Sequence, residues 1–468
     1  MLTYSFENLG GESLYIHLYK CIRADILSGE IAPGTRLPSK RSFAENLGVS
    51  VITVENAYAQ LISEGYLYAV PKKGFFAAAL ERRVPPEKPA TVKAAVPDTP
   101  RYFADFSSNR TDPDNFPFAT WAKLMRGTIS AQNAELMTNA PCGGVPALRE
   151  AIAAHLYAFR GIQADPDRII VGAGTEYLYG LIIQLLGFDK IYALEDPGYR
   201  KIAKIYESHG VGYRLIPMDH DGVRLDALRG SGADILHISP SHHFPTGIVT
   251  PVARRYALLR WAEEAPARYI LEDDYDSEFR LTGRPIPALQ SVDAAERVLY
   301  MNTFTKTLAS TIRISYMVLP PHLAERFYTQ LGFYACTVSN LEQYTLAKFI
   351  AQGYLEKHIN RMRNRYKLKK NRILEEMERC GLFRVAEAEG AESGLHFLLR
   401  VHTGESPRAI ERRALENGVR ITCLADYYQE TPQHPEPTFV ISYSAIPDAR
   451  IPEAVRRLAQ AVGVAGSA

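Results

Sequence analysis

The first 80 residues carry apolar side chains at helical spacing, in runs that end at glycines. The first run, 14–26, stops before Gly29 and predicts one amphipathic helix. Residues 39–48 and 50–64 predict two further helices, each begun by a serine that can cap free backbone amides and each followed or ended by a glycine. The second and third helices are therefore joined by a tight turn.

A β-hairpin with a basic tip follows the third predicted helix. Residues 66–70 and 75–77 are strand-like and flank a turn that holds Lys72 and Lys73. Two helices, a tight turn, a third helix and a basic hairpin describe a winged helix-turn-helix, in which the helix after the turn enters the major groove of DNA. Residues 1–80 are therefore interpreted as a DNA-binding domain.

The candidate DNA contacts are polar or basic side chains at the start of the second helix, around the third helix and at the hairpin tip. They are Arg36, Ser39, Lys40, Arg41, Ser50, Thr53, Asn56, Lys72 and Lys73. The basic members would face phosphates in such a domain. Residues 1–80 contain seven basic and seven acidic side chains, so solvated lysines on a protein-interaction domain are the alternative interpretation.

Residues 81–104 are rich in proline and lack apolar periodicity. Prolines stand at positions 85, 86, 89, 97 and 100, which predicts a stiff, extended linker. The linker separates the first domain from residues 105–468, in which we expect a smaller C-terminal subdomain from about residue 360 to 468.

Six short apolar runs in the larger part alternate with helical patterns. The predicted strands are 168–171, 190–194, 233–239, 269–271, 298–302 and 314–319. This α/β alternation is typical of a largely parallel sheet covered by helices on both faces, with a ligand site at the carboxyl ends of the strands. Residues 340–380 are mainly helical in pattern and very basic around 361–370, as expected of one long helix with a solvated face.

The composition is that of a globular protein with more than one domain. Of 468 residues, 46% are hydrophobic and 23% are charged, which excludes a disordered, collagen-like or disulfide-scaffold protein. The formal net charge of +2 provides no overall field toward nucleic acid or an anionic membrane, so any basic patch must be local. Five scattered cysteines without a CxxC pair favour a reducing compartment. No leader and no apolar run of membrane-spanning length is found, which predicts a cytoplasmic protein without a membrane partner.

Three chemical features converge on one rim of the predicted sheet. The turn 172–177 joins a strand to a helix where free amides favour a phosphate, but it lacks the third glycine of a dinucleotide fold and the lysine of a P-loop. Asp273 ends another strand, and Lys306 follows the next one. Taken singly, these could be a tight turn, a helix cap and a solvated lysine. Together they are the set that pyridoxal 5'-phosphate needs: amides for the phosphate, a carboxylate for the pyridinium and an amine for the aldehyde.

His237, His242 and His243 are the nearest approach to a metal-binding cluster in the sequence. A strand places neighbouring side chains on opposite faces, and no carboxylate accompanies the three histidines. No metal site is therefore predicted.

Both parts of the chain resemble known families. The residues that resemble the GntR-type DNA-binding domain are 14–15, 29, 33–34, 37–39, 47–50, 53–54, 57–58, 61 and 64–67. The segments 195–199, 239–247, 272–280, 283–285 and 303–313 carry a resemblance to fold type I aminotransferases that covers about residues 105–460. The fusion resembles the MocR-type subgroup of GntR regulators, which implies a winged helix-turn-helix followed by aminotransferase-like large and small domains that bind pyridoxal phosphate.

The resemblance implies a role for each residue of the candidate cofactor site. Lys306 would form the Schiff base with the cofactor, Asp273 would pair with the ring nitrogen, and Tyr275 would bond the ring hydroxyl. Tyr199 would stack on the ring. The phosphate would be held by Thr175, Glu176, Thr303, Thr305 and Arg313.

The sequence departs from these families at positions that bind ligands. Val440 stands where active aminotransferases anchor the substrate carboxylate with an arginine, Asn139 replaces a tyrosine expected from a neighbouring subunit, and Phe244 replaces an asparagine. Without a bidentate carboxylate partner, poor turnover is expected, although residual transamination stays an option. In the first domain, Val51 replaces an arginine that would read guanine.

The predicted function is a transcriptional regulator that binds a double-stranded DNA operator and senses pyridoxal phosphate or a small amine or amino acid. The resemblance also implies a homodimer, and domain swapping is frequent in MocR-type regulators. Two alternatives stay open: a catalytically active aminotransferase with an accessory interaction domain, and a DNA-binding protein whose larger part is purely structural. Val440 favours sensing of the cofactor itself, while the operator and the direction of regulation are open.

Overall fold

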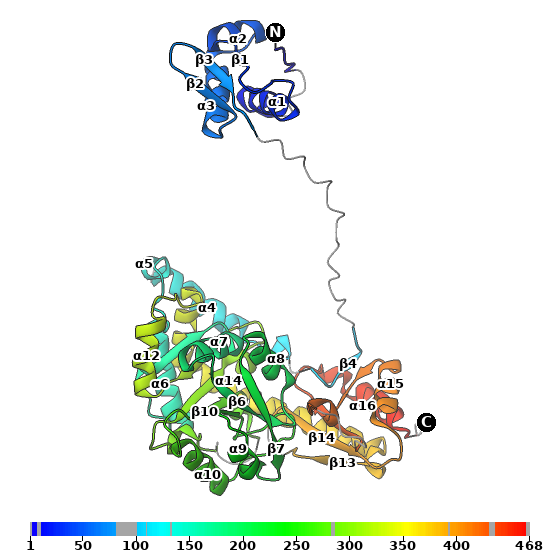
Figure 1. Ribbon diagram of the computed structural model, residues 1–468. Helices are drawn as coiled ribbons and strands as arrows, with labels where there is room; N and C mark the ends of the chain where they lie inside the picture. The colour runs from blue at the N-terminus through cyan, green and yellow to red at the C-terminus, as the bar shows by residue number, and fades with distance from the viewer. Residues whose placement is uncertain are drawn as a thin grey trace. The chain divides into compact units, whose positions relative to one another are not determined.

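The chain divides into two compact units, residues 1–99 and 100–468 (Figure 1). The computed structural model describes residues 2–6, 11–80, 101–108, 110–131, 133–281, 286–391, 394–429 and 436–464. Of the predicted linker, residues 81–100 lie outside the described residues, as does the motif 283–285, and Ala104 begins a strand.

The first unit consists of three helices and a three-stranded antiparallel sheet. Its elements are α1 (Leu14–Ser28), β1 (Arg36–Leu37), α2 (Lys40–Leu47), α3 (Val51–Ser63), β2 (Leu67–Val70) and β3 (Gly74–Ala77). The strand order is β1-β3-β2, so β1 extends the predicted hairpin by a third strand. Ser39 and Ser50 cap α2 and α3 by accepting hydrogen bonds from the backbone amides of Ser42 and Thr53.

One face of each helix builds the core of this unit. Leu18 and Ile22 of α1 pack with Val54 and Leu61 of α3, and none of the four has exposed surface. Gly48 turns the chain between α2 and α3 at φ +66°, a left-handed conformation that glycine adopts without strain. The unit therefore has the predicted winged helix-turn-helix order of elements.

Arg36 has a different setting from the one predicted. The sequence pattern places it at the start of the second helix, whereas in the structure it belongs to β1 and pairs with Phe76 of β3. Its guanidinium lies against Gly74 at the end of the hairpin turn, where an added Cβ would come 3.3 Å from Nε. A strand of two residues is too short to show a period of alternation, so the pattern could not reveal it.

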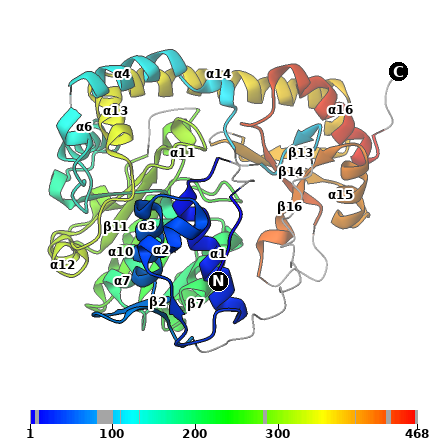
Figure 2. The ribbon, with the colours of Figure 1, turned by 90° about the horizontal axis from the view of Figure 1, so that it is seen from above.

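The second unit contains an eight-stranded sheet of order β5-β12-β11-β10-β9-β6-β7-β8 (Figures 1 and 2). Its strands are β5 (Ile169–Gly172), β6 (Ile191–Asp196), β7 (Gly212–Asp219), β8 (Gly222–Val223), β9 (Ile235–Ile238), β10 (Tyr269–Asp274), β11 (Val298–Thr303) and β12 (Ser315–Val318). The pairs from β11 to β7 are parallel, and β12 is antiparallel to both of its neighbours. The pattern missed β7 because only Ile216 of this strand is buried.

Side chains alternate along the strands and pack into hydrophobic cores on both faces of the sheet. In β11, Val298 and Tyr300 pack on one face, and Leu299 and Met301 on the other. Helices α7, α8 and α12 cover the face of Leu299, while α6, α10 and α13 cover the opposite face. The helices of this part are α4 (Phe118–Ala131), α5 (Asn133–Leu136), α6 (Pro146–Arg160), α7 (Thr175–Leu186), α8 (Arg200–Ser208), α9 (Leu225–Gly230), α10 (Val252–Glu263), α11 (Phe304–Thr307), α12 (Pro321–Leu331) and α13 (Asn340–Ala351).

A four-stranded antiparallel sheet of order β13-β14-β17-β16 forms a C-terminal lobe in the same unit. The lobe comprises β13 (Ala386–Glu389), β14 (His396–Val401), β16 (Thr422–Cys423) and β17 (Thr438–Ser442), with α14 (Tyr354–Arg379), α15 (Pro407–Glu416) and α16 (Ile451–Val462). β4 (Ala104–Asp105) pairs in parallel with β15 (Val419–Arg420), so the chain enters the second unit through this lobe. The short 3-10 helices are η1 (Pro113–Asn115), η2 (Pro166–Arg168), η3 (Ser277–Phe279), η4 (Gln290–Val292), η5 (Leu382–Arg384), η6 (Leu424–Tyr427) and η7 (Asp448–Arg450).

The predicted long helix over 340–380 is two helices. Gly353, at φ +73°, separates α13 from α14 because its left-handed backbone interrupts helical geometry. α14 connects the two cores of the unit: Ile359 packs with the helices under the large sheet, and Ile373 packs in the C-terminal lobe (Figure 2). Among the described residues, no helix has the length and apolar character needed to cross a membrane.

Candidate functional site

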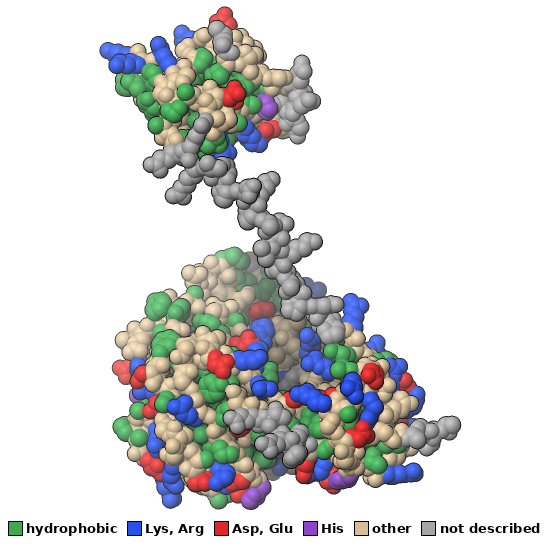
Figure 3. Space-filling model, turned by 45° about the vertical axis from the view of Figure 1, so that its right-hand side comes forward, with side chains coloured by type: hydrophobic (Ala, Val, Ile, Leu, Met, Phe, Trp, Pro, Cys, Tyr) green, Lys and Arg blue, Asp and Glu red, His purple; other side chains and the backbone are tan. Residues whose placement is uncertain are grey.

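A cavity of about 700 Å³ opens at the carboxyl ends of the central strands of the large sheet. Loops at this edge are where sheets of this class place their ligands. All of the predicted cofactor-site residues line the cavity: Thr175, Glu176, Tyr199, Asp273, Tyr275, Thr303, Thr305, Lys306 and Arg313. Figure 3 shows Lys and Arg side chains bordering a hollow on one face of this unit.

A glycine turn and an arginine form a cradle for an anion at one end of the cavity. β5 leads into α7 through Gly174, which has φ +96°, and a Cβ at this position would collide with the guanidinium of Arg313. The guanidinium therefore lies directly against the N-terminus of α7, where unpaired amides and the helix dipole also favour negative charge. This arrangement suits a phosphate group.

The Glu176 carboxylate reaches the same cradle from the first turn of α7. It forms an ion pair with Lys201, and its Oε2 lies 3.4 Å from Nη2 of Arg313. The hydrogen bond from Lys201 is the main cause that lowers the pKa of Glu176. An ionised carboxylate cannot donate to a phosphate, so only the backbone amide of Glu176 suits the predicted role, and its side chain instead neutralises two neighbouring cations.

Asp273, at the end of β10, has one carboxylate oxygen engaged and one unpaired. The Tyr179 hydroxyl donates to Oδ2 at 2.5 Å, and Nε2 of His237 lies 3.6 Å from the same oxygen. Oδ1 is buried without a hydrogen-bond partner among the described residues. A buried acceptor without a donor is costly, so the geometry fits a ligand that presents a ring N–H at this point.

Tyr179, His237 and Tyr206 support Asp273, and sequence reasoning did not assign them to the site. The Tyr206 hydroxyl lies 3.0 Å from Nδ1 of His237. Burial raises the pKa of both tyrosines well above the ordinary value, so both keep their protons. Tyr179 follows Thr175 by one helical turn and could have been found from that spacing. His237 could not, because its proximity depends on β9 lying beside β10.

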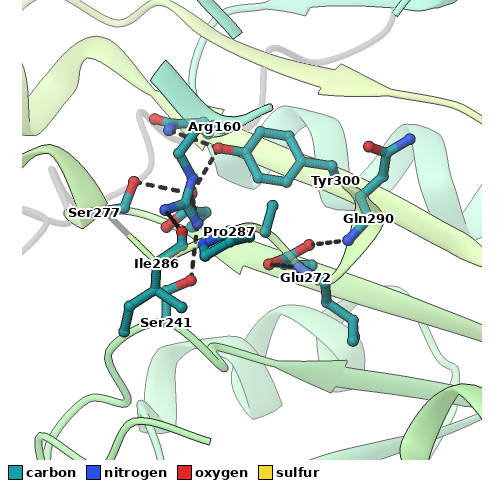
Figure 4. Close-up of polar contacts among 12 residues, drawn as sticks. Arg160, Ser241, Glu272, Ser277, Ile286, Pro287, Gln290 and Tyr300 are labelled. Atoms are coloured by element: carbon teal, nitrogen blue, oxygen red, sulfur yellow. Dashed lines mark hydrogen bonds and ion pairs between the residues drawn. The ribbon is translucent and has the colours of Figure 1, made fainter. Parts of the chain in front are cut away.

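The acids on either side of Asp273 point away from the cavity because side chains alternate along a strand. Asp274 pairs with Arg160 at 2.9 Å between Oδ2 and Nη2, and these side chains are 1% and 2% exposed. Glu272 accepts backbone hydrogen bonds at 2.9 Å, one of them from Gln290 (Figure 4). These buried contacts hold the end of β10 and thereby position Asp273.

Lys306 lies on α11, the short helix that follows β11. Burial lowers the pKa of its ammonium group to about 8, against the smaller and opposite effect of the Asp276 charge. The Thr303 hydroxyl accepts hydrogen bonds from Thr305 N at 3.1 Å and from Ser315 Oγ at 2.8 Å, and it donates to Thr305 Oγ1 at 2.8 Å. Thr303 therefore uses its hydroxyl to fix the start of the helix that carries the lysine.

An aromatic wall closes the cavity toward the C-terminal lobe. Phe244 makes edge contacts with Tyr199, at 5.8 Å between ring centroids, and with Tyr427, at 5.3 Å. Behind this wall, Val440 is fully buried and packs with Phe244 and Leu398. The position that an arginine clamp would occupy is therefore part of an apolar cluster.

Tyr275 is held by a buried histidine and acid. Its hydroxyl lies 3.3 Å from Nδ1 of His242, and that nitrogen lies 2.9 Å from Oδ2 of Asp276. His243 instead contacts the Thr246 hydroxyl through Nδ1 at 2.7 Å. Among the residues that the structure describes, no group of three potential ligands is arranged to hold a metal ion.

The candidate DNA contacts lie on the outside of the first unit. Seven of the nine are exposed, and the other two, Lys40 and Thr53, are half-buried. Lys40 donates to Glu55 at 2.6 Å, which offsets part of its charge. Because Ser39 and Ser50 use their hydroxyls as helix caps, any contact that they make with a phosphate would run through the helix N-termini.

Comparison with protein families matches both units. The model described as "Bacterial regulatory proteins, gntR family" matches residues 14–77, and "Aminotransferase class I and II" matches residues 103–458. The HTH-type transcriptional regulator YdeL of Bacillus subtilis, itself uncharacterised, is 35% identical over 95% of this chain and 96% of its own length. The probable rhizopine catabolism regulatory protein MocR of Rhizobium meliloti is 31% identical, covering 96% of this chain and 93% of its own length.

A further relative and a solved structure extend the comparison. The HTH-type pyridoxine biosynthesis transcriptional regulator PdxR of Corynebacterium glutamicum is 29% identical over 90% of each chain. The kynurenine aminotransferase of Pyrococcus horikoshii has a TM-score of 0.67 and 23% identity, and the match covers 78% of this chain and 91% of the enzyme. This last likeness shows the aminotransferase fold.

Proposed function

We propose that this chain, which belongs to the gntR family of bacterial regulatory proteins and carries an aminotransferase class I and II domain, is a transcriptional regulator. Its first unit would bind an operator, and its second unit would sense a small molecule. The observation that carries the proposal is the combination, in one chain, of a winged helix-turn-helix with a cavity that contains a low-pKa lysine, an unpaired carboxylate oxygen and an anion cradle.

The second unit would hold pyridoxal 5'-phosphate, which supplies an aldehyde that condenses with primary amines. Lys306 would provide the amine, and its lowered pKa keeps part of it neutral near pH 7. Asp273 Oδ1 would accept from the ring N–H, while Tyr179 fixes the other oxygen. Gly174 and Arg313 would receive the phosphate.

The remaining cavity residues would complete this site. Tyr199, half of whose surface is covered, would stack on the ring, and Tyr275 would bond its hydroxyl. Thr175, Thr305 and the backbone of Glu176 would contribute donors to the phosphate. Thr303 would act through the hydrogen bonds that fix α11.

Sensing, rather than efficient turnover, is the role that we propose for the cavity. The apolar cluster around Val440 offers no cation to a substrate carboxylate, so an ordinary amino acid would lack a bidentate partner there. The second candidate is an aminotransferase that retains activity, and the complete cofactor set is the observation that favours it.

We further propose that the protein acts as a cytoplasmic homodimer. Two winged helix-turn-helix domains could then occupy paired half-sites on an operator. The effector would be pyridoxal phosphate itself or a small amine, and it would act by binding one arrangement of the protein more tightly than another.

The proposal is tested by titrating the apo-protein with pyridoxal phosphate while following imine absorbance and affinity for DNA upstream of the protein's own gene. We expect an absorbance band and a change in operator affinity, both lost in Lys306→Ala. Arg41→Ala should lose the DNA footprint and keep the band. A protein that stays colourless contradicts the cofactor assignment, and multiple-turnover transamination without a footprint supports the second candidate.

A further inference from the structure

Arg110 is a cation of the cavity that the cofactor assignment does not use. Its side chain is exposed, lines the cavity, and enters no ion pair or side-chain hydrogen bond among the described residues. Lys201 and Arg313 line the same cavity, but both are paired with Glu176. The guanidinium of Arg110 is therefore available to a ligand that the cavity admits.

The backbone around Arg110 is fixed on both sides. The Ser444 hydroxyl donates to the carbonyl of Arg110 at 2.7 Å. The next residue, Thr111, exchanges two hydrogen bonds with Ser310: Thr111 N donates to Ser310 Oγ, and Ser310 N donates to Thr111 Oγ1, each at 3.1 Å. Ser310 stands four residues after Lys306 and also lines the cavity. These bonds tie Arg110 to the loop that follows the lysine.

The apolar cluster that lines the cavity toward the C-terminal lobe contains no charged side chain among its described members. Phe244 and Tyr427 form its surface, and Val440 and Leu398 pack behind them. Arg200 also lines the cavity, but its Nη1 donates to a backbone carbonyl at 3.1 Å. A ligand with an acidic group would therefore find its uncommitted cation at Arg110.

We propose that Arg110 binds an anionic group of the effector and so selects amines that carry an acid over amines that do not. This inference rests on the proposed function, because it assumes that the effector approaches Lys306. An arginine can hold a carboxylate through two parallel N–H···O bonds, and that pairing is stronger than the same contact with a neutral group. The specificity then arises at Arg110 and not at the position of Val440.

The test measures the preference for an acid in matched ligands. Holo-protein is titrated with the linear amino acids from glycine to 5-aminopentanoate, and with alkylamines in which a methyl group replaces the carboxylate. The shift of the absorbance band gives each dissociation constant. We expect that, at one chain length, the wild-type protein binds the amino acid with a dissociation constant about tenfold or more below that of the matched alkylamine. In Arg110→Gln the two dissociation constants should become nearly equal, and Arg110→Lys should restore part of the difference.

Arg200→Gln is the matched control, because Arg200 lines the same cavity with its guanidinium already bonded. It should keep the wild-type preference, and Arg110→Gln should keep the wild-type affinity for pyridoxal phosphate. The proposal is overturned if Arg200→Gln loses the preference for the amino acid over the alkylamine and Arg110→Gln keeps it. It is also overturned if the wild-type protein shows the absorbance band but no such preference at any ligand chain length. A protein without the band contradicts the proposed function, and this inference with it.

Discussion

The lysine in the cavity predicts an unusual pH dependence for cofactor uptake. Burial lowers the pKa of Lys306 from its ordinary value of 10.5 to about 8. Only the neutral amine can attack an aldehyde. At pH 7 a group with a pKa of 8 is about one-tenth neutral, whereas an ordinary lysine is neutral in roughly 3 of 10,000 molecules, an advantage of about 300-fold.

The measurement is the initial rate of absorbance change when apo-protein is mixed with pyridoxal phosphate at a series of pH values. The rate should rise with pH below a midpoint near 8 and level off above it, because the neutral amine then predominates. Lys306→Ala defines the slower background reaction of other lysines and should show no midpoint near 8. A rate that continues to rise with an apparent pKa above about 10 would refute the argument from burial.

Three further predictions concern packing, the phosphate cradle and DNA. Arg160→Met should leave the buried Asp274 charge without its cationic partner, with only the hydrogen bonds from Tyr300 and Ser277, and should lower the free energy of unfolding in denaturant titrations by about 3–5 kcal/mol. Arg229→Met breaks only an exposed pair and should cost less than about 1 kcal/mol. Gly174→Ala should weaken pyridoxal phosphate binding in an absorbance titration, since its Cβ would displace the Arg313 guanidinium and φ +96° disfavours alanine; unchanged affinity would argue against the cradle. Lys73→Ala should reduce the slope of log K against log[salt] for operator binding by about one, and an unchanged slope would remove this lysine from the DNA interface.

The sequence was sufficient to predict the elements whose patterns are local. Gly48 and the caps at Ser39 and Ser50 define the helix-turn-helix. Asp273 lies at the end of one buried strand and Lys306 follows another, and continuous apolar runs reveal both strands. In a parallel sheet such positions share one edge, which is why they could be brought together without a structure.

What the sequence could not provide depends on contacts between distant elements. His237 reaches Asp273 only because β9 and β10 are neighbours. The resemblance places Glu176 at the phosphate, but the ion pairs of its carboxylate with Lys201 and Arg313 require α8 and the loop before β12 to come close. Arg36 was misplaced because a two-residue strand is defined by its partner and not by its own pattern.

The pairing of β4 with β15 has a mechanical consequence. Phe103 N donates to Gly418 O at 2.8 Å, and Phe106 N donates to Arg420 O at 2.9 Å, while Ser442 N donates back to Phe106 O at 2.7 Å. The chain that follows the first unit is thus hydrogen-bonded to the C-terminal lobe before it reaches the large sheet. Any displacement of that lobe would therefore also displace residues 103–106, the first part of the second unit that the chain forms.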